Sequence, residues 1–466
     1  MRILKFFITL SRKRKHIKTP IVISFSISII LQITLLPKKY FVKQKMNLPS
    51  RHFQILFLIF TICIFKGGSS YGQEGLTIAP EISLGTEAQS SGFLKSSIFQ
   101  RQVMVSFSKK PIPNSSAWEY WSPVSHTGIN VGVTDFNSSS RGYAFSAMGF
   151  MVLKSKRLRR WSLQLGYGAS YFTNKFDIED NIENRSISTD ITWSNRAVLQ
   201  YTFLEKNRVD YSIGLGAMHH SNGHTRLPND GINTFHLSLA AAIKSKEKNT
   251  VATIPIMRER SIYHYLSARL GLGLNALGDS FPLDDKKGVY SLSGEYGLVF
   301  NKVMSIGIGG FYRYYEHYYD YIKNGEFLVR ENEEFNSYTK QPWHNATNYG
   351  AFVKFELLLN HIGIEILTGF NFHKPGYDID WRINGGWEFI PRDPPDYWIF
   401  GEFDSEYKLK KLLTTRLGIK YYLKATENVP KHNMYIGAFI NGNGGQADFS
   451  EIGLGYVYNW NFRKRN

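Results

Sequence analysis

The segment Trp161–Phe172 reads Trp-Ser-Leu-Gln-Leu-Gly-Tyr-Gly-Ala-Ser-Tyr-Phe and is decisive for the fold class. Its odd-numbered residues are apolar, and from Ser162 to Ser170 its even-numbered residues are small or polar. Successive side chains of a β-strand point to opposite faces, so the pattern predicts a strand with one apolar and one polar face. Such strands are typical of a membrane barrel with lipid outside and a polar lumen.

The same alternation recurs from Thr127 to the end of the chain. Three further clear runs are Leu266–Leu274, Leu417–Leu423 and Ile452–Phe462. Together these runs predict an all-β, antiparallel outer-membrane barrel of roughly 12–14 strands over residues 126–462. A soluble β-sandwich is the alternative, since its strands also alternate. Three polar insertions are expected to be extracellular loops, at residues 177–184, 322–345 and 374–397.

The N-terminal region has the features of a targeting segment. Residues 46–72 contain a basic start, an apolar stretch from Phe53 to Phe65 and small residues near Gly72, as in a secretory signal peptide. We expect cleavage close to Gln73. Residues 1–45 are expected to be an over-extended start or an extra apolar segment. Residues 73–125 show little periodicity and are expected to be poorly ordered, apart from one candidate short strand at Val103–Ser108.

Charge and cysteine content narrow the function classes. The net charge is +18, but residues 1–72 carry 13 Lys or Arg and no acidic residue, so the remainder carries only +5. The remainder of the chain lacks a dense basic run of the kind that would suggest a nucleic-acid partner. The single cysteine, Cys63, lies in the apolar stretch of the signal peptide, so cysteine chemistry is excluded for the processed chain.

The segment Met218–Pro228 carries the candidate chemistry. It continues the strand pattern of Tyr211–Ala217, so His219 and Ser221 are expected on the same face as Ile213. A base two residues from a hydroxyl, at the end of an apolar stripe, is the arrangement of an activated serine beside lipid. His220 points to the opposite face.

This segment resembles the signature of PagL-type lipid A 3-O-deacylases, which are outer-membrane barrels. The matching residues are His219-His220-Ser221-Asn222-Gly223, followed by Pro228-Asn229-Asp230-Gly231-Ile232-Asn233. The resemblance implies an outer-membrane serine esterase that removes an acyl chain from lipid A. It does not extend beyond about residue 245.

The resemblance also implies a role for each matching residue. His219 corresponds to the general base and Ser221 to the nucleophile. The oxyanion hole and its support are expected from four residues of the connecting loop. These are Asn222, Gly223, His224 and Asn229.

One position departs from the family. The third member of the family's triad is a glutamate, and Asn233 stands in its place. Outer-membrane phospholipase A also has a His-x-Ser-Asn-Gly motif and a triad that ends in asparagine, so it is the alternative resemblance. Asp230 is the alternative orienting group for His219.

The remaining expectations concern ligands and location. The histidines 219, 220 and 224 alternate in direction and lack a carboxylate partner, so we expect no metal and no cofactor. The expected partner is lipid A or a phospholipid in the bacterial outer membrane, and a homodimer is an open alternative. A channel or adhesin is the non-enzymatic alternative.

Overall fold

The computed structural model describes residues 76–87, 99–109, 117–154, 157–245, 260–277, 286–383 and 403–465. The expected signal peptide and the expected extra segment, residues 1–72, lie outside the described residues. Within the described ranges, no helix is both long and apolar enough to cross a membrane.

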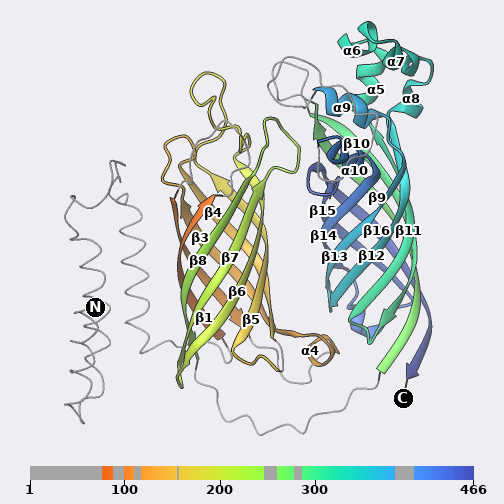
Figure 1. Cartoon of the computed structure of the whole chain (residues 1–466). Coiled ribbons are helices and arrows are strands. Elements are labelled where there is room, and N and C mark those ends of the chain that lie inside the picture. Colours follow the sequence, from red (N-terminus) through yellow and green to blue (C-terminus); the bar gives the residue numbers. More distant parts are fainter. Residues whose placement is uncertain are drawn as a thin grey trace, which may run out of the picture. The chain divides into compact units, whose positions relative to one another are not determined.

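In the described residues, sixteen antiparallel strands form two closed barrels (Figure 1). The strands of the first barrel are β1 (Leu76–Glu87), β2 (Phe99–Lys109), β3 (Val124–Asp135), β4 (Tyr143–Lys154), β5 (Trp161–Phe172), β6 (Ile191–Glu205), β7 (Val209–Ser221) and β8 (Ile232–Lys244). Those of the second are β9 (Arg260–Ala276), β10 (Lys286–Phe300), β11 (Met304–Tyr315), β12 (Thr347–Leu359), β13 (Ile362–His373), β14 (Leu413–Tyr422), β15 (His432–Gly442) and β16 (Ala447–Arg465).

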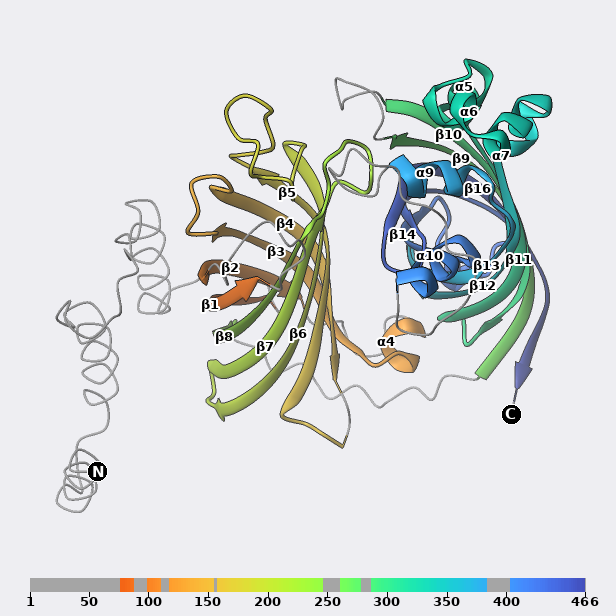
Figure 2. The ribbon, with the colours of Figure 1, turned by 45° about the horizontal axis from the view of Figure 1, so that its top comes forward.

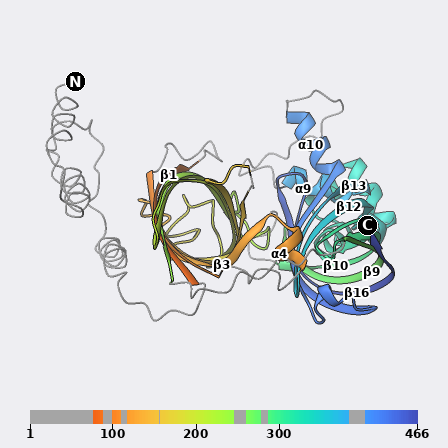
Figure 3. The same cartoon turned by 90° about the horizontal axis from the view of Figure 1, so that it is seen from below.

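The expected all-β barrel class is confirmed, but the strands form two barrels and not the one that we expected. We expected one barrel of about 12–14 strands, whereas pairing of β8 with β1 closes the first barrel and pairing of β16 with β9 closes the second. The view in Figure 3 shows the strands of the first barrel as a ring. The division arises from long-range pairing, which alternation within single strands does not encode.

The expectation of poor order in residues 73–125 is wrong for β1, while the candidate strand at Val103–Ser108 falls within β2. Strands β1 and β2 lie there and pair with each other over their whole lengths. Their order comes from this pairing and from that of β1 with β8, which places polar β1 residues such as Glu81 in the lumen.

Both barrels follow the two-sided pattern that their sequence predicts. Outward residues are apolar and exposed, with Leu215 66%, Leu270 64% and Ile366 59% accessible. Inward residues are polar: in the first barrel, Gln164 accepts a hydrogen bond of 2.7 Å from the Arg196 guanidinium. This is the pattern of an outer-membrane barrel rather than of a soluble sandwich, whose apolar residues face a shared core.

Short helices lie in the connections at one end of the second barrel (Figure 2). The β11–β12 connection holds α5 (Glu316–Lys323), α6 (Phe327–Glu331), α7 (Glu333–Asn336), η1 (Ser337–Lys340) and α8 (Pro342–Asn345). The β13–β14 connection holds α9 (Gly376–Ile383) and α10 (Phe403–Leu412). Elsewhere, α4 (Ala117–Trp121) lies in the β2–β3 connection of the first barrel, and η2 (Thr426–Asn428) lies between β14 and β15. The long insertions of the second barrel thus carry helices that we did not predict.

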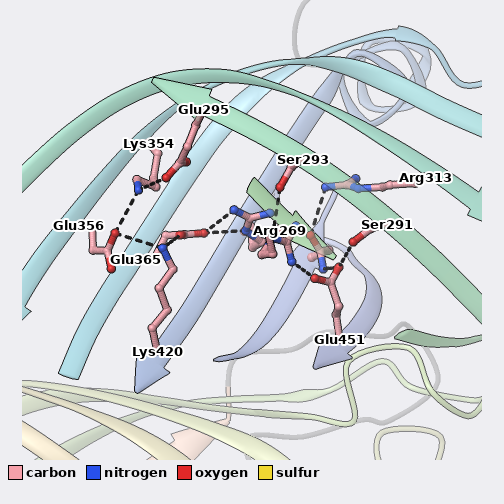
Figure 4. A network of polar contacts seen from close by, with 12 residues as sticks. Arg269, Ser291, Ser293, Glu295, Arg313, Lys354, Glu356, Glu365, Lys420 and Glu451 are labelled. Carbon is pink, nitrogen blue, oxygen red and sulfur yellow. Dashed lines mark hydrogen bonds and ion pairs between the residues drawn. The ribbon is translucent and has the colours of Figure 1, made fainter. Parts of the chain in front are cut away.

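A ladder of ion pairs fills the lumen of the second barrel (Figure 4). Lys354 pairs with Glu295 and, at 3.0 Å, with Glu356. Lys420 pairs with Glu356 at 3.0 Å and with Glu365 at 2.5 Å. Further pairs connect Arg416 to Glu365 and Arg269 to Glu451. Eight strands enclose only enough space for side chains, so paired charges take the place of a water-filled pore.

Removal of one ladder cation should destabilise the second barrel. Lys420→Met leaves Glu356 and Glu365 short of a partner, and breaking a buried pair costs about 3 kcal/mol. We expect the folded band to convert to the unfolded band at a lower temperature in gel electrophoresis. Lys340→Met, at an exposed position in η1, is the control and should leave the transition unchanged. Equal transitions in both variants would contradict a stabilising role for the ladder.

Candidate active site

Strand β7 and the start of β8 position the candidate residues. His219 and Ser221 are outward residues at the end of β7, and a loop of residues 222–231 leads into β8. His219 lies directly opposite Asn233 in the β7–β8 register. The hairpin therefore brings together three residues that are up to 14 positions apart in the sequence.

Asn233 holds the ring of His219. The distance from His219 Nδ1 to Asn233 Oδ1 is 2.7 Å. An amide oxygen can only accept a hydrogen bond, so Nδ1 carries the hydrogen and Nε2 keeps its lone pair. In the neutral ring this arrangement makes Nε2 the nitrogen that can accept a proton, and no hydrogen bond from another described residue reaches it.

Two donors surround the hydroxyl of Ser221. Asn229 Nδ2 lies 2.9 Å from Ser221 Oγ, and the backbone N–H of Gly223 lies 3.1 Å from it. Among the described residues no hydrogen bond joins Ser221 Oγ to His219. Side chains two positions apart on one strand face are roughly 6.6 Å apart, and apo catalytic hydrogen bonds are often loose.

Asn222 organises the loop and does not face Ser221. Its Nδ2 donates to Ser188 Oγ at 3.0 Å and to the Arg226 carbonyl at 2.7 Å. Its backbone N–H donates to Asn229 Oδ1 at 3.0 Å. Asn229 is thereby held at its oxygen and presents its amino group to Ser221. The side-chain donor at the hydroxyl is therefore Asn229, while Asn222 supports it.

Gly223 turns the chain beside the hydroxyl, to which its backbone N–H donates, while His224 and Asp230 do not contact it by a hydrogen bond in the described structure. Gly223 and His224 both have left-handed backbones, with φ of 66° at each, and turn the chain out of β7. No hydrogen bond joins the His224 ring to Ser221 or His219 in the described structure. Asp230 is exposed and does not contact His219 by a hydrogen bond either, so Asn233 and not Asp230 takes the orienting position.

His220 faces the lumen, as its alternation predicts. Its Nδ1 lies 2.8 Å from Ser194 Oγ, the first member of a buried chain of serines on neighbouring strands. Ser194 lies 2.7 Å from Ser170, which lies 2.6 Å from Ser146. This chain ties β4, β5, β6 and β7 together behind the candidate site.

The sequence did not reveal the neighbours that β6 supplies. In the β6–β7 register Trp193 lies opposite Ser221, Asn195 opposite His219 and Ala197 opposite Ala217. No local motif marks these β6 residues, because only the register brings them to the site. Among the described residues, no group of three or more His, Cys, Asp or Glu is arranged to hold a metal ion.

Gly231 gives the His219 ring its space. A Cβ at this position would lie 3.2 Å from His219 Cε1 and 3.0 Å from the His220 carbonyl oxygen, and φ is 72°. We expect Gly231→Ala to displace the ring and to slow labelling of Ser221 by a fluorophosphonate about 10-fold, a loss of roughly 1.4 kcal/mol.

Gly325 provides the matched control for this substitution. It has a φ of 61°, and a Cβ there would meet no atom within 4 Å. Gly325→Ala carries the same backbone cost, about 1 kcal/mol, and should leave labelling unchanged. Equal labelling rates in the two variants would show that Gly231 has no role beyond its backbone conformation.

Comparisons with known proteins give one family match and several distant structural ones. Residues 101–242 match the family model described as "Lipid A 3-O-deacylase (PagL)". The crystal structure of the outer membrane enzyme PagL aligns with 16% identity and a TM-score of 0.26, over 35% of this chain and 97% of that chain. The search of curated proteins gave no match.

Two other solved structures also align. De novo designed transmembrane β-barrels align with 14% identity and a TM-score of 0.21, over 37% of this chain and 98% of that chain. The outer membrane protein opdK from Pseudomonas aeruginosa aligns with 11% identity and a TM-score of 0.19, over 83% and 98%. The family assignment rests on the sequence match: residues 101–242 form a domain of the PagL lipid A 3-O-deacylase family.

Proposed function

We propose that the chain is a serine esterase of the bacterial outer membrane that removes an ester-linked acyl chain, at the 3-O position, from lipid A. One observation carries the proposal: a His219–Asn233 pair stands beside Ser221 on the outward wall of a barrel that contains a PagL-family domain. The substrate class follows from the family, and the reaction type follows from the arrangement of the three side chains.

The reaction is acyl transfer through Ser221. His219 Nε2 accepts the proton of the hydroxyl as Oγ attacks the ester carbonyl. The tetrahedral intermediate collapses, the carbon–oxygen bond to the sugar breaks, and His219 returns the proton to the departing alcohol. Water then attacks the acyl-enzyme with His219 as base, which releases the fatty acid and restores Ser221.

Asn229 and Gly223 supply the donors for the oxyanion. Their N–H groups already lie within 3.1 Å of Ser221 Oγ. A carbonyl carbon bonded to this oxygen brings its own oxygen into the same neighbourhood. Fixed donors of this kind stabilise the developing charge without reorganisation.

The outward wall suits an acyl chain. Small residues, Ala197 and Ala217, lie in the row next to His219, and larger apolar residues, Leu199 and Leu215, lie in the row beyond. An acyl chain that leaves the ester carbonyl can run along this wall without leaving the hydrocarbon. The site therefore meets its substrate inside the membrane, where acyl esters are concentrated.

A phospholipase A is the second candidate, and Asn233 is the observation that favours it. An asparagine orients the imidazole but does not stabilise the imidazolium as a carboxylate does. The family match supports lipid A as the first candidate, and phospholipid is the competing substrate.

The nucleophile and the base should be indispensable. We expect Ser221→Ala and His219→Ala each to lower fatty-acid release from purified lipid A by at least about 1,000-fold, because the two groups act as a unit. Mass spectrometry of lipid A and of phospholipid in the same samples identifies the substrate. His432→Ala, on the exposed surface of β15, is the control for histidine loss and should keep full activity.

Each outcome of this experiment separates the candidates. Release from phospholipid alone would favour the phospholipase. Unchanged release by Ser221→Ala from both lipids would contradict any serine esterase.

The orienting amide should matter less than the base it holds. Asn233→Ala removes one hydrogen bond, worth about 1 kcal/mol, and should lower the turnover number about 5-fold to 10-fold. Asn233→Glu restores the carboxylate of the family pattern and should keep or raise activity on lipid A. Loss of all activity in Asn233→Glu, with the folded barrel retained, would show that the site is adapted to a neutral partner.

A further inference from the structure

The end of the second barrel that carries its short turns is basic. Figure 1 shows this end, where β16 terminates, opposite the helices of the β11–β12 connection. Among the described residues of the turns at 301–303, 360–361 and 423–431, the only carboxylate belongs to Glu427. The β11–β12 connection, residues 316–346, contains six carboxylates and three Lys or Arg residues. The two ends of this barrel therefore differ in the sign of their charge.

Three cations of the short-turn end lie close together, and we call them the basic rim: Arg260, Lys302 and Arg463. The Nζ atom of Lys302 lies 5.6 Å from the centre of the Phe462 ring. Arg463 is opposite Ile262 in the β16–β9 register, so Arg260 is its diagonal neighbour, with about 7–8 Å between Cβ atoms. Both arginine side chains are exposed to the surroundings of the barrel.

Lys302 has a backbone conformation that favours glycine. Its φ is 63°, and that of Asn301 is 53°. Asparagine tolerates the left-handed region, whereas lysine there has a steric cost that glycine would not have. The N–H of Ser261 donates to Asn301 Oδ1 at 3.1 Å, and the N–H of Asn301 donates to the Ser261 carbonyl at 2.8 Å, which fixes the turn beside β9. A cation kept in this conformation favours a function for its side chain.

A belt of aromatic and histidine rings lies on the outer face next to the basic rim. His264 Nδ1 lies 2.7 Å from the Tyr296 hydroxyl, and the His264 ring stacks on Trp460 with 5.6 Å between ring centres. Trp460 stacks on Tyr458 at 5.5 Å, and the Tyr458 ring lies 5.3 Å from that of His432. Aromatic belts of this kind mark the boundary between hydrocarbon and lipid headgroups.

We propose that the basic rim binds the phosphates of anionic phospholipid headgroups in the periplasmic leaflet of the outer membrane. The short turns of an outer-membrane barrel face the periplasm, and the periplasmic leaflet consists of phospholipids. The proposal rests on the outer-membrane location within the proposed function and is independent of the esterase activity. It gives the second barrel a role of its own, outside the PagL-family domain at residues 101–242.

The depth of the rim and its chemistry both support this partner. Arg260 lies two outward positions before His264 on β9, so the rim is just beyond the belt on the side away from the hydrocarbon. The headgroup region is about 5–7 Å deep on each side of a bilayer, and Lys and Arg side chains are long enough to reach through it. Guanidinium groups bind phosphate with paired N–H donors, and lysine adds a point charge. An acidic protein would match the charge but not the adjoining belt.

The test measures phospholipid binding by the folded protein purified from outer-membrane fractions in a non-ionic detergent. Native mass spectrometry follows titrations with phosphatidylglycerol and with phosphatidylethanolamine. The wild-type protein should bind phosphatidylglycerol more tightly, and its preference should fall when the ammonium acetate concentration is raised, because salt screens exposed charges. The triple variant Arg260→Gln, Lys302→Gln, Arg463→Gln should bind phosphatidylglycerol about 10-fold more weakly or worse, since each cation near an anionic surface contributes severalfold.

The matched control removes the same amount of charge from the other end of the barrel. It carries Lys323→Gln, Arg330→Gln and Lys340→Gln, all at exposed positions of the β11–β12 connection. This control should bind phosphatidylglycerol as the wild type does. Both triple variants should keep the folded band in gel electrophoresis without heating.

The single variant Lys302→Gly separates charge from folding. It removes one cation of the rim and relieves the backbone cost at φ 63°. We expect its affinity for phosphatidylglycerol to fall about 5-fold, while the folded band converts to the unfolded band at the same or a higher temperature. If the triple variant does not fold, this variant alone decides the outcome.

Three results would overturn the proposal. Equal affinities of the rim variant and its control would exclude the rim as the binding site, and equal binding of the two phospholipids by the wild type would exclude a preference for anionic lipid. Tight binding of polyglutamate by the wild type, with no preference between the lipids, would assign the rim to an acidic protein. Hydrolysis of lipid A is not measured, so failure of the esterase proposal would leave this test intact.

Discussion

Closure of the β-sheet is the constraint on which the rest of this structure depends. In a closed barrel every strand residue faces either the lumen or the outside, and no edge strand is left with unpaired backbone groups. Neighbouring residues therefore have opposite surroundings: His220 joins a buried serine chain, while His219 stands on the outer wall. The lumen holds the polar groups that stabilise the barrel, and the outer wall is free to carry chemistry.

The same constraint explains how much of the fold could be predicted. Period-2 alternation is a local property, and the predicted run Trp161–Phe172 coincides with β5. The number of barrels is a non-local property, because it depends on whether β8 returns to β1 or continues to β9. Strand β1 was missed because its alternation is weak, with Pro80 and Glu81 side by side, and its partners at both edges supply its order.

The candidate site, too, could be predicted from local sequence only in part. His219, Ser221, Asn229 and Asn233 belong to one hairpin and its loop, so a sequence motif could predict that they lie together. The motif could not predict which amide faces the hydroxyl, because Asn222 and Asn229 differ only in how the loop folds. Asn195 carried no signal at all, since it reaches His219 only through the pairing of β6 with β7.

The neutral third member of the site is consistent with its place on the wall. A carboxylate beside His219 would stabilise the imidazolium that forms during attack, but it would also be an ionised group facing hydrocarbon, where charge is expensive. Asn233 fixes the ring through the same kind of hydrogen bond without that cost. What the asparagine does not provide is charge stabilisation in the transition state. In the proposed mechanism, more of that work then rests on Asn229 and Gly223, whose N–H groups lie beside Ser221 Oγ and would act on the oxyanion rather than on the imidazolium.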